Sequence, residues 1–271
     1  MSTELRPDVA SFWCAVPRDV LAIEGPDALT YLHSQVSQDL LTLAVADAVP
    51  SLVLDPAGKV VALVRVTRRA DTAFLVDVDA GFGELLAARL ARFKIRVKAE
   101  ITNLDWSCIA VRSTDAVPLA PVDTAGSLAV PAWWANGTAI DLLGPAPAPP
   151  PGVTEGTTAD LAAARVRAGW PATGAEIVPG ETVPAGLGVV GVAVSFAKGC
   201  YPGQELVERM DSRGAAAPRV LRRIEAPDAQ PGDPLVVDGA EVGTYTSVAG
   251  GWALAWVRRG VEIGVAVDQL A

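Results

Sequence analysis

The sequence predicts an α+β protein whose chain ends in a small β-barrel or sandwich. The first 115 residues alternate short apolar runs with helical patterns, which is typical of mixed strands and helices. Proline and alanine become frequent from residue 116, and regular short apolar runs separated by glycine-rich turns begin near Pro218. We therefore divide the chain into a first α+β lobe (1–115), a second lobe (116–217) and a β-rich unit (218–271).

The first lobe opens with a predicted strand, a helix and a hairpin. Residues 20–24 predict a short strand, and Pro26 then suits the first turn of a helix whose apolar residues recur at helical spacing. Val-rich runs at 51–55 and 59–67 are joined by Asp55-Pro-Ala-Gly58, a strong turn signal. We expect these two runs to form a β-hairpin.

The lobe continues with a strand at 72–78, an amphipathic helix at 82–93, and strands at 95–101 and 106–112. In the strand at 95–101, Lys94, Arg96 and Lys98 would share one face because side chains alternate along a strand. This basic face is either a solvated outer surface or a surface for an anionic ligand such as a polyglutamate tail or RNA.

The second lobe contains a stiff connector at 145–152 and a helix at 157–168, which begins with a capping pattern around Thr157 and Asp160. Five short strands follow in the last segment and are expected at 219–225, 235–237, 241–248, 253–258 and 262–267.

Composition excludes several classes of protein. Apolar residues make up 51% of the chain and the mean hydropathy is +0.33, so disorder is not its main state. The net charge is 22 − 31 = −9, which argues against direct nucleic-acid binding, because phosphate contacts need a basic surplus.

The chain has one histidine, His33, and three widely spaced cysteines, Cys14, Cys108 and Cys200. Paired-histidine zinc sites, a disulfide framework and a four-cysteine cluster site are therefore not available, and we expect no metal site. No signal peptide is recognisable, and prolines and glycines break the longest uncharged stretch, which starts at Thr182. We expect a cytoplasmic protein without a membrane partner.

Residues Gly186 to Gly191 match the pattern G-x-G-x-x-G of dinucleotide-binding proteins. That pattern needs a strand before it and a helix after it. Here a loop precedes and residues 192–196 read as a strand, so we interpret the segment as a glycine-rich loop.

The most informative stretch runs from Lys198 to Glu205 (KGCYPGQE), a tight loop that leads into a helix at 204–210. Gly199 and Gly203 permit unusual backbone angles and a close approach of other groups. A nearby helix N-terminus and Lys198 favour the Cys200 thiolate, whereas Glu205 opposes it. A buried structural cysteine remains the alternative.

This stretch matches the K-G-C-[FY]-x-G-Q-E motif of the YgfZ family, which comprises folate-binding relatives of the glycine-cleavage T-protein, an aminomethyltransferase. Three further segments resemble that family in the same order, namely 31–39 (YLHSQVSQD), 55–59 (DPAGK) and 165–171 (RVRAGWP). The resemblance covers nearly the whole chain.

The resemblance implies T-protein-like mixed α/β lobes around a central folate channel, with a C-terminal β-barrel. It implies an accessory protein that supports iron–sulfur enzyme maintenance and, through it, tRNA modification. Its cofactor would be tetrahydrofolate or a derivative, and its partners would be a reduced folate and iron–sulfur proteins.

The site residues follow from the matched segments and from folate chemistry. Cys200 and Lys198 would act in any reaction. Glu176 or Glu205 would bind the donor–acceptor edge of the pterin, and Arg165, Arg209 or Lys198 the glutamate tail. The complete folate-binding set is Arg165, Glu176, Lys198, Tyr201, Gln204, Glu205 and Arg209.

The alternative is a tetrahydrofolate-dependent, aminomethyltransferase-like one-carbon transferase, so whether the protein is an enzyme stays open. T-protein enzymes carry acids shortly after the hairpin glycine, where this chain has Ala62 and Leu63. Neither side chain can move a proton or stabilise a cation, which favours the YgfZ branch.

An RNA-binding module is a third, weaker reading. Four tryptophans are candidates either for stacking on a pterin or for the core, namely Trp13, Trp133, Trp134 and Trp170.

Overall fold

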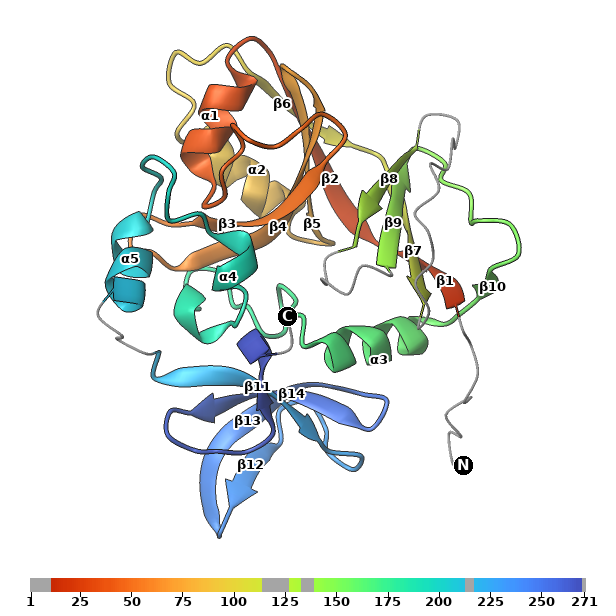
Figure 1. Cartoon of the computed structure of the whole chain (residues 1–271), viewed down its shortest axis with the longest axis vertical. Coiled ribbons are helices and arrows are strands. Elements are labelled where there is room, and N and C mark those ends of the chain that lie inside the picture. Colours follow the sequence, from red (N-terminus) through yellow and green to blue (C-terminus); the bar gives the residue numbers. More distant parts are fainter. Residues whose placement is uncertain (1–10, 114–126, 133–138, 213–216, 270–271) are drawn as a thin grey trace.

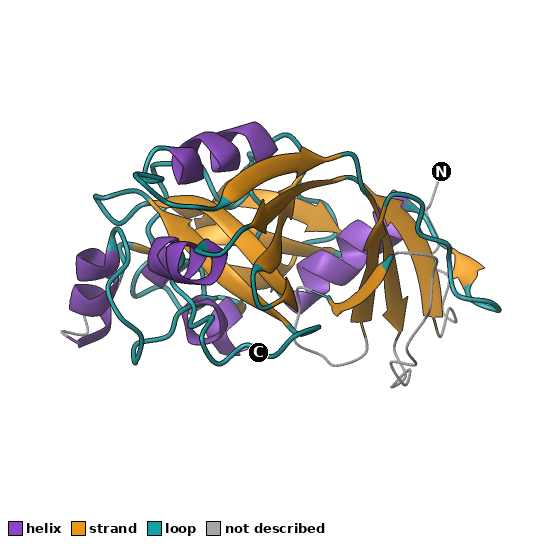
Figure 2. Ribbon diagram, turned by 90° about the horizontal axis from the view of Figure 1, so that it is seen from above, coloured by secondary structure: helices purple, strands orange, loops and turns teal. Residues whose placement is uncertain are grey.

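The computed structural model describes residues 11–113, 127–132, 139–212 and 217–269. Each of three parts is built on one five-stranded sheet. In Figure 1 the first sheet lies at the top, the second at the right and the C-terminal sheet at the bottom. Figure 2 shows the same molecule from above, with helices on both the upper and lower sides of the strands.

The first lobe is an antiparallel sheet with strand order β3-β4-β5-β2-β6. Its strands are β2 (Arg18–Glu24), β3 (Ala48–Leu54), β4 (Val60–Ala70), β5 (Ala73–Asp79) and β6 (Glu100–Leu104). One face is covered by α1 (Ala28–Gln35) and α2 (Gly83–Ala91), whose apolar residues form the largest buried cluster with that face. The predicted hairpin is present as β3 and β4, closed by the turn at 55–58.

The second sheet has the order β10-β1-β7-β9-β8. Its strands are β1 (Ser11–Val16), β7 (Ser107–Ser113), β8 (Leu128–Pro131), β9 (Ala139–Gly144) and β10 (Thr154–Glu155). It packs on the other face of the first sheet, where Val20, Ala22 and Leu75 meet Cys108, Val130 and Leu143. The sheets thus divide the chain differently from a boundary at residue 115, because β1 and β7 come from the range 1–115.

The C-terminal unit has the order β12-β13-β14-β11-β15 and is entirely antiparallel. Its strands are β11 (Arg219–Glu225), β12 (Pro234–Val237), β13 (Ala240–Ala249), β14 (Trp252–Arg258) and β15 (Val265–Ala266). The predicted strand at 262–267 is mostly wrong, because only Val265–Ala266 pair and the next three residues form a 3₁₀ turn, η2 (Val267–Gln269).

The segment that joins the sheets contains α3 (Thr158–Ala168), η1 (Pro184–Gly186), α4 (Val190–Ala193) and α5 (Gln204–Ser212). The start of α3 confirms the predicted capping pattern, since the Thr157 hydroxyl accepts from the Asp160 amide while the Asp160 carboxylate accepts from the Thr157 amide. This helix lies between the second sheet and the C-terminal unit (Figure 1). Its Val166 is buried against Leu221 and Leu254.

Two further predicted strands differ from the structure: the one at 95–101 is a strand only in its last two residues, which begin β6, and the one at 192–196 is absent. Residues 95–99 are a loop in which Arg96 has a φ of +57°, so Lys94, Arg96 and Lys98 do not share a strand face. The Lys94 ammonium instead donates to the Ala99 carbonyl across the loop. Residues 192–196 are not a strand either, because α4 occupies their beginning. In both places apolar residues alternate with other residues over a short stretch, which resembles a strand pattern, but no neighbouring strand is available for pairing.

Among the described residues, none of the helices is both long enough and apolar enough to cross a membrane.

Candidate functional site

The KGCYPGQE loop lies between α4 and α5 and packs against the β3–β4 hairpin turn. Gly203 has a φ of +83°, and a Cβ there would lie 2.5 Å from the Asp55 carbonyl oxygen and 2.9 Å from the Gly58 Cα. Gly58 is equally confined, because its Cβ would lie 2.5 Å from the Leu206 Cβ. Gly203 and Gly58, 203 − 58 = 145 positions apart, therefore bring two segments into direct backbone contact, and only glycine fits at both positions.

Lys198 ties the same loop to α1. Its side chain is buried, and its ammonium donates to the His33 and Val36 carbonyl oxygens, each 2.5 Å away. The ammonium also lies 4.9 Å from the centre of the Tyr201 ring. Burial lowers the pKa of Lys198 to about 8, although the Asp39 carboxylate opposes the change.

Cys200 is exposed, whereas Cys14 and Cys108 are buried. The alternative of a buried structural cysteine is therefore wrong for Cys200. Its neighbour Tyr201 turns inward, and burial, reinforced by the Glu208 carboxylate, raises the pKa of that phenol to about 12. The loop thus presents one thiol to solvent between two inward-facing side chains.

The predicted folate residues on α5 lie at the surface. Glu205 and Arg209 form an ion pair one helical turn apart, with side chains 86% and 50% exposed. Gln204 accepts from the Tyr201 amide and donates to Glu208, so it closes the start of the helix. All three side chains belong to α5, which begins four residues after Cys200.

Glu176 and Arg165 form a second cluster, at the junction with the C-terminal unit. The buried Glu176 carboxylate accepts four hydrogen bonds, from Arg165 (2.9 Å), the Ala172 amide (2.9 Å), Thr246 (2.7 Å) and Ser247 (2.6 Å). Arg165 also donates to the Trp170 carbonyl and to Ser247. Every lone pair that a pterin edge would need on Glu176 is already in use.

The residues predicted to bind folate therefore do not form one cluster, and the Glu176 carboxylate has no acceptor position left for a pterin edge. They are divided between the surface of α5, the Lys198 anchor and the saturated Glu176 cluster. A carboxylate that reads a pterin edge must have free acceptor positions in a cavity. Glu176 has no free acceptor position, and the side chain of Glu205 is 86% exposed.

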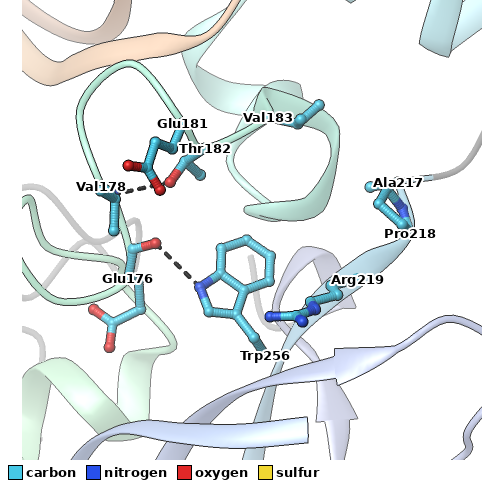
Figure 3. A pocket seen from close by; sticks show the side chains of 9 residues that line it. All are labelled: Glu176, Val178, Glu181, Thr182, Val183, Ala217, Pro218, Arg219 and Trp256. Atoms are coloured by element: carbon cyan, nitrogen blue, oxygen red, sulfur yellow. Dashed lines mark hydrogen bonds between the residues drawn. The ribbon is translucent and has the colours of Figure 1, made fainter.

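A cavity of about 260 Å³ lies beside the Glu176 cluster (Figure 3). The Trp256 indole donates to the Glu176 carbonyl oxygen, which fixes the ring against the cavity, while the Glu176 carboxylate points away from it. Glu181 and Arg219 lie at opposite sides of the opening. Glu176 therefore contributes its backbone, not its charge, to this cavity.

Sequence reasoning missed a buried ionic network between the first two sheets. Arg65 pairs bidentately with Asp77 (2.9 and 3.0 Å) and contacts Asp141 (2.8 Å), which also accepts from Arg112. Arg18 completes the network through Asp77. Burial opposes the charge of Asp141, but Arg112 and Arg65 outweigh it and hold the pKa of that carboxyl below its ordinary value. Single charged residues inside otherwise apolar strands were the available signal.

The remaining tryptophan candidates lie in the hydrophobic core or outside the described residues. Trp170 is buried with the hairpin strands, and Trp13 packs in the second sheet, while Trp133 and Trp134 lie outside the described residues. His33 is half-buried, and burial and the Lys198 charge lower its pKa. Within the described ranges, no group of three His, Cys, Asp or Glu residues could hold a metal ion.

Comparison with solved structures identifies the fold. The glycine cleavage system aminomethyltransferase T of Bartonella henselae superposes with a TM-score of 0.71 over 95% of this chain and 85% of that protein, at 16% sequence identity. The chain has the aminomethyltransferase T fold. The predicted α+β fold class with its C-terminal β-barrel is thereby confirmed, and residues 218–265 match the model of the CAF17 C-terminal β-barrel domain.

Two fungal relatives are named iron–sulfur cluster assembly factor IBA57 homologues of mitochondria. The protein of Chaetomium globosum is 29% identical over 85% of this chain, and that of Pyricularia oryzae is 27% identical over 78%. The chain spans 60% and 57% of the length of these two proteins. The chain is thus similar to IBA57 homologues through most of its length and carries a CAF17-type barrel.

Proposed function

We propose that this protein is an accessory factor for the assembly or maintenance of iron–sulfur proteins, with Cys200 as its working thiol. The observation that carries the proposal is the exposed Cys200, held in a loop that is fixed at both ends. The names of the fungal relatives support the same role. Because no second motif cysteine lies in the loop, any cluster ligand beyond Cys200 would come from a partner protein or a small molecule.

Further parts of the proposal come from the resemblance to the YgfZ family. Enzymes that modify tRNA with iron–sulfur clusters would be among the proteins served, and the site of action would be the cytoplasm. A reduced folate would be a ligand of the protein. The fold shared with aminomethyltransferase T is compatible with this ligand, but a group other than the saturated Glu176 carboxylate would have to bind the pterin edge.

The test of the thiol is a gene deletion complemented with variants. Cells that carry Cys200→Ser should lose activity of iron–sulfur enzymes as severely as the deletion does, most clearly under oxidative conditions. The matched control is Cys14→Ala, which alters a buried thiol and should restore activity. Full activity with Cys200→Ser would refute the role of this thiol.

Tetrahydrofolate binding is tested separately by equilibrium dialysis with the full chain. A saturable isotherm with one site per chain would support the folate part of the proposal. No binding at millimolar tetrahydrofolate would remove that part and leave the role of Cys200 intact.

One-carbon transfer is the second candidate, and the shared fold favours it. Against it, Ala62 and Leu63 are buried in β4 and supply no proton-transfer group at the positions where T-protein enzymes carry acids. Turnover of purified protein with tetrahydrofolate and small methylamine donors would establish this activity.

A further inference from the structure

Several hydrogen bonds attach residues 192–198, just before Cys200, to the end of α1, and those of Lys198 are the last of them along the chain. The Ser195 amide donates to the Ser37 carbonyl, and the Ser37 hydroxyl donates to the Ala193 carbonyl. The Gln38 side chain donates to the Val192 carbonyl. Segment 192–198 is therefore held along residues 36–38; Phe196 and Ala197 are exposed within it, Lys198 is buried, and Gly199 and Cys200 are exposed again.

The acceptors of Lys198 are carbonyl groups at the C-terminal end of a helix. His33 lies in the last turn of α1 and Val36 is its C-cap, so their oxygens lack full intrahelical partners. The C-terminal end of a helix also carries partial negative charge, which favours a cation. An ammonium that donates to both oxygens completes the end of α1 from a loop 162 residues away.

The same ammonium is buried without a carboxylate in contact. Among the hydrogen bonds and ion pairs of the described residues, Lys198 has only the two carbonyl oxygens, and the Tyr201 ring faces it. A buried ammonium is costly unless it is well solvated by protein groups. This cost makes the position of the side chain specific, since any movement of the loop would leave the charge or the two carbonyls unpaired.

The other end of the loop is fixed by a different device. Gly203 lies against the Asp55 carbonyl and the Gly58 Cα of the hairpin turn. Gly199, in contrast, has no atom within 4 Å of a built Cβ. The exposed Cys200 therefore lies between an electrostatic anchor on α1 and a steric anchor on the hairpin.

We propose that Lys198 is a positioning residue, which orients the Cys200 loop by binding the C-terminal carbonyls of α1 and does not itself take part in chemistry. This inference rests on the proposed use of Cys200 and assigns Lys198 a role different from the catalytic one expected from the motif. Two of the three N–H donors of the ammonium are occupied by acceptors on its own protein, which fixes the direction of the side chain.

Hydrogen exchange of the full chain, read by mass spectrometry, tests the anchor. Lys198→Met keeps the length of the side chain and removes its donors. Exchange in peptides covering 196–204 and 33–40 should become at least about tenfold to a hundredfold faster, since the loss of even one hydrogen bond to a charged donor has an effect of that size. Peptides from β11 to β14 should keep their rates. The control Lys98→Met removes an exposed lysine and should change neither region.

A role beyond mere structure is tested with the same variants in the complementation assay. Lys198→Arg retains N–H donors, so it should recover part of the protection and part of the activity that Lys198→Met loses. Unchanged exchange at 196–204 in Lys198→Met would overturn the anchor. Full activity of Lys198→Met in cells where Cys200→Ser is inactive would overturn positioning and leave the proposed function standing. Full activity of Cys200→Ser would instead refute the proposed function, while the exchange data would still decide the anchor.

Discussion

The two glycines of the KGCYPGQE loop offer a matched pair of substitutions with opposite expected outcomes. An alanine at Gly203 would have to adopt a φ of +83°, which costs a residue with a Cβ about 1–2 kcal/mol. Its Cβ would also lie 2.5 Å from a backbone oxygen, so the loop or the hairpin turn must move. Forced repacking of this kind costs about 1–3 kcal/mol. Together these terms predict that Gly203→Ala lowers the free energy of unfolding by about 2–5 kcal/mol.

Gly199→Ala adds the same methyl group four residues earlier. Nothing lies within 4 Å of its built Cβ, and its φ is not positive. We expect a change of no more than about 0.5 kcal/mol, because surface substitutions without steric conflict are nearly neutral.

Urea unfolding of both variants, followed by tryptophan fluorescence, measures the difference through the midpoint and the slope. Equal midpoints for Gly199→Ala and Gly203→Ala would refute the close contact between the loop and the hairpin turn. A lower midpoint for Gly199→Ala would likewise contradict the open space beside that residue.

Three other predictions concern the buried charges. Between pH 8 and 10.5 the unfolded chain retains a proton on Lys198 that the folded chain has lost. The free energy of unfolding should therefore rise by about 2–3 kcal/mol across this window, relative to the Lys198→Met variant. Urea unfolding at a series of pH values measures the rise. Glu176→Gln should lower the free energy of unfolding by about 3 kcal/mol, because it leaves the half-buried Arg165 without its countercharge. The exposed Glu205→Gln should cost under about 1 kcal/mol. Asp77→Asn should be as costly as Glu176→Gln, since two buried arginines depend on that carboxylate; a calorimetric midpoint equal to that of the unaltered protein would contradict this.

Local patterns predicted most of the elements correctly. The hairpin at the Asp55–Gly58 turn, the capped helix after Thr157 and four of the five C-terminal strands depend on residues that are close in sequence. The loop at 95–99 was mistaken for a strand because an alternating pattern does not reveal whether a neighbouring strand is available for pairing. A positive φ at Arg96 is likewise invisible in the sequence.

The motif loop was recognised from its letters, but the roles of its residues were only partly predictable. Its conformational freedom was attributed equally to Gly199 and Gly203, and only the packed hairpin distinguishes them. Glu176 and Glu205 were equivalent as carboxylates. Glu176 has a structural role, because it accepts hydrogen bonds from Thr246 and Ser247 of the C-terminal sheet. Glu205 is instead an exposed surface group on α5.

The amino-acid sequence by itself determined the α+β class, the C-terminal β-rich unit and the position of the one loop in which a thiol, a lysine and two glycines occur together. These features depend on interactions between residues a few positions apart, which the order of side chains specifies directly. Only the tertiary structure decided that Cys200 is exposed, that Lys198 binds α1 and that Glu176 is saturated. The partners of these groups lie tens to more than a hundred residues away, and burial and hydrogen bonding at such separations arise only when the sheets and helices pack.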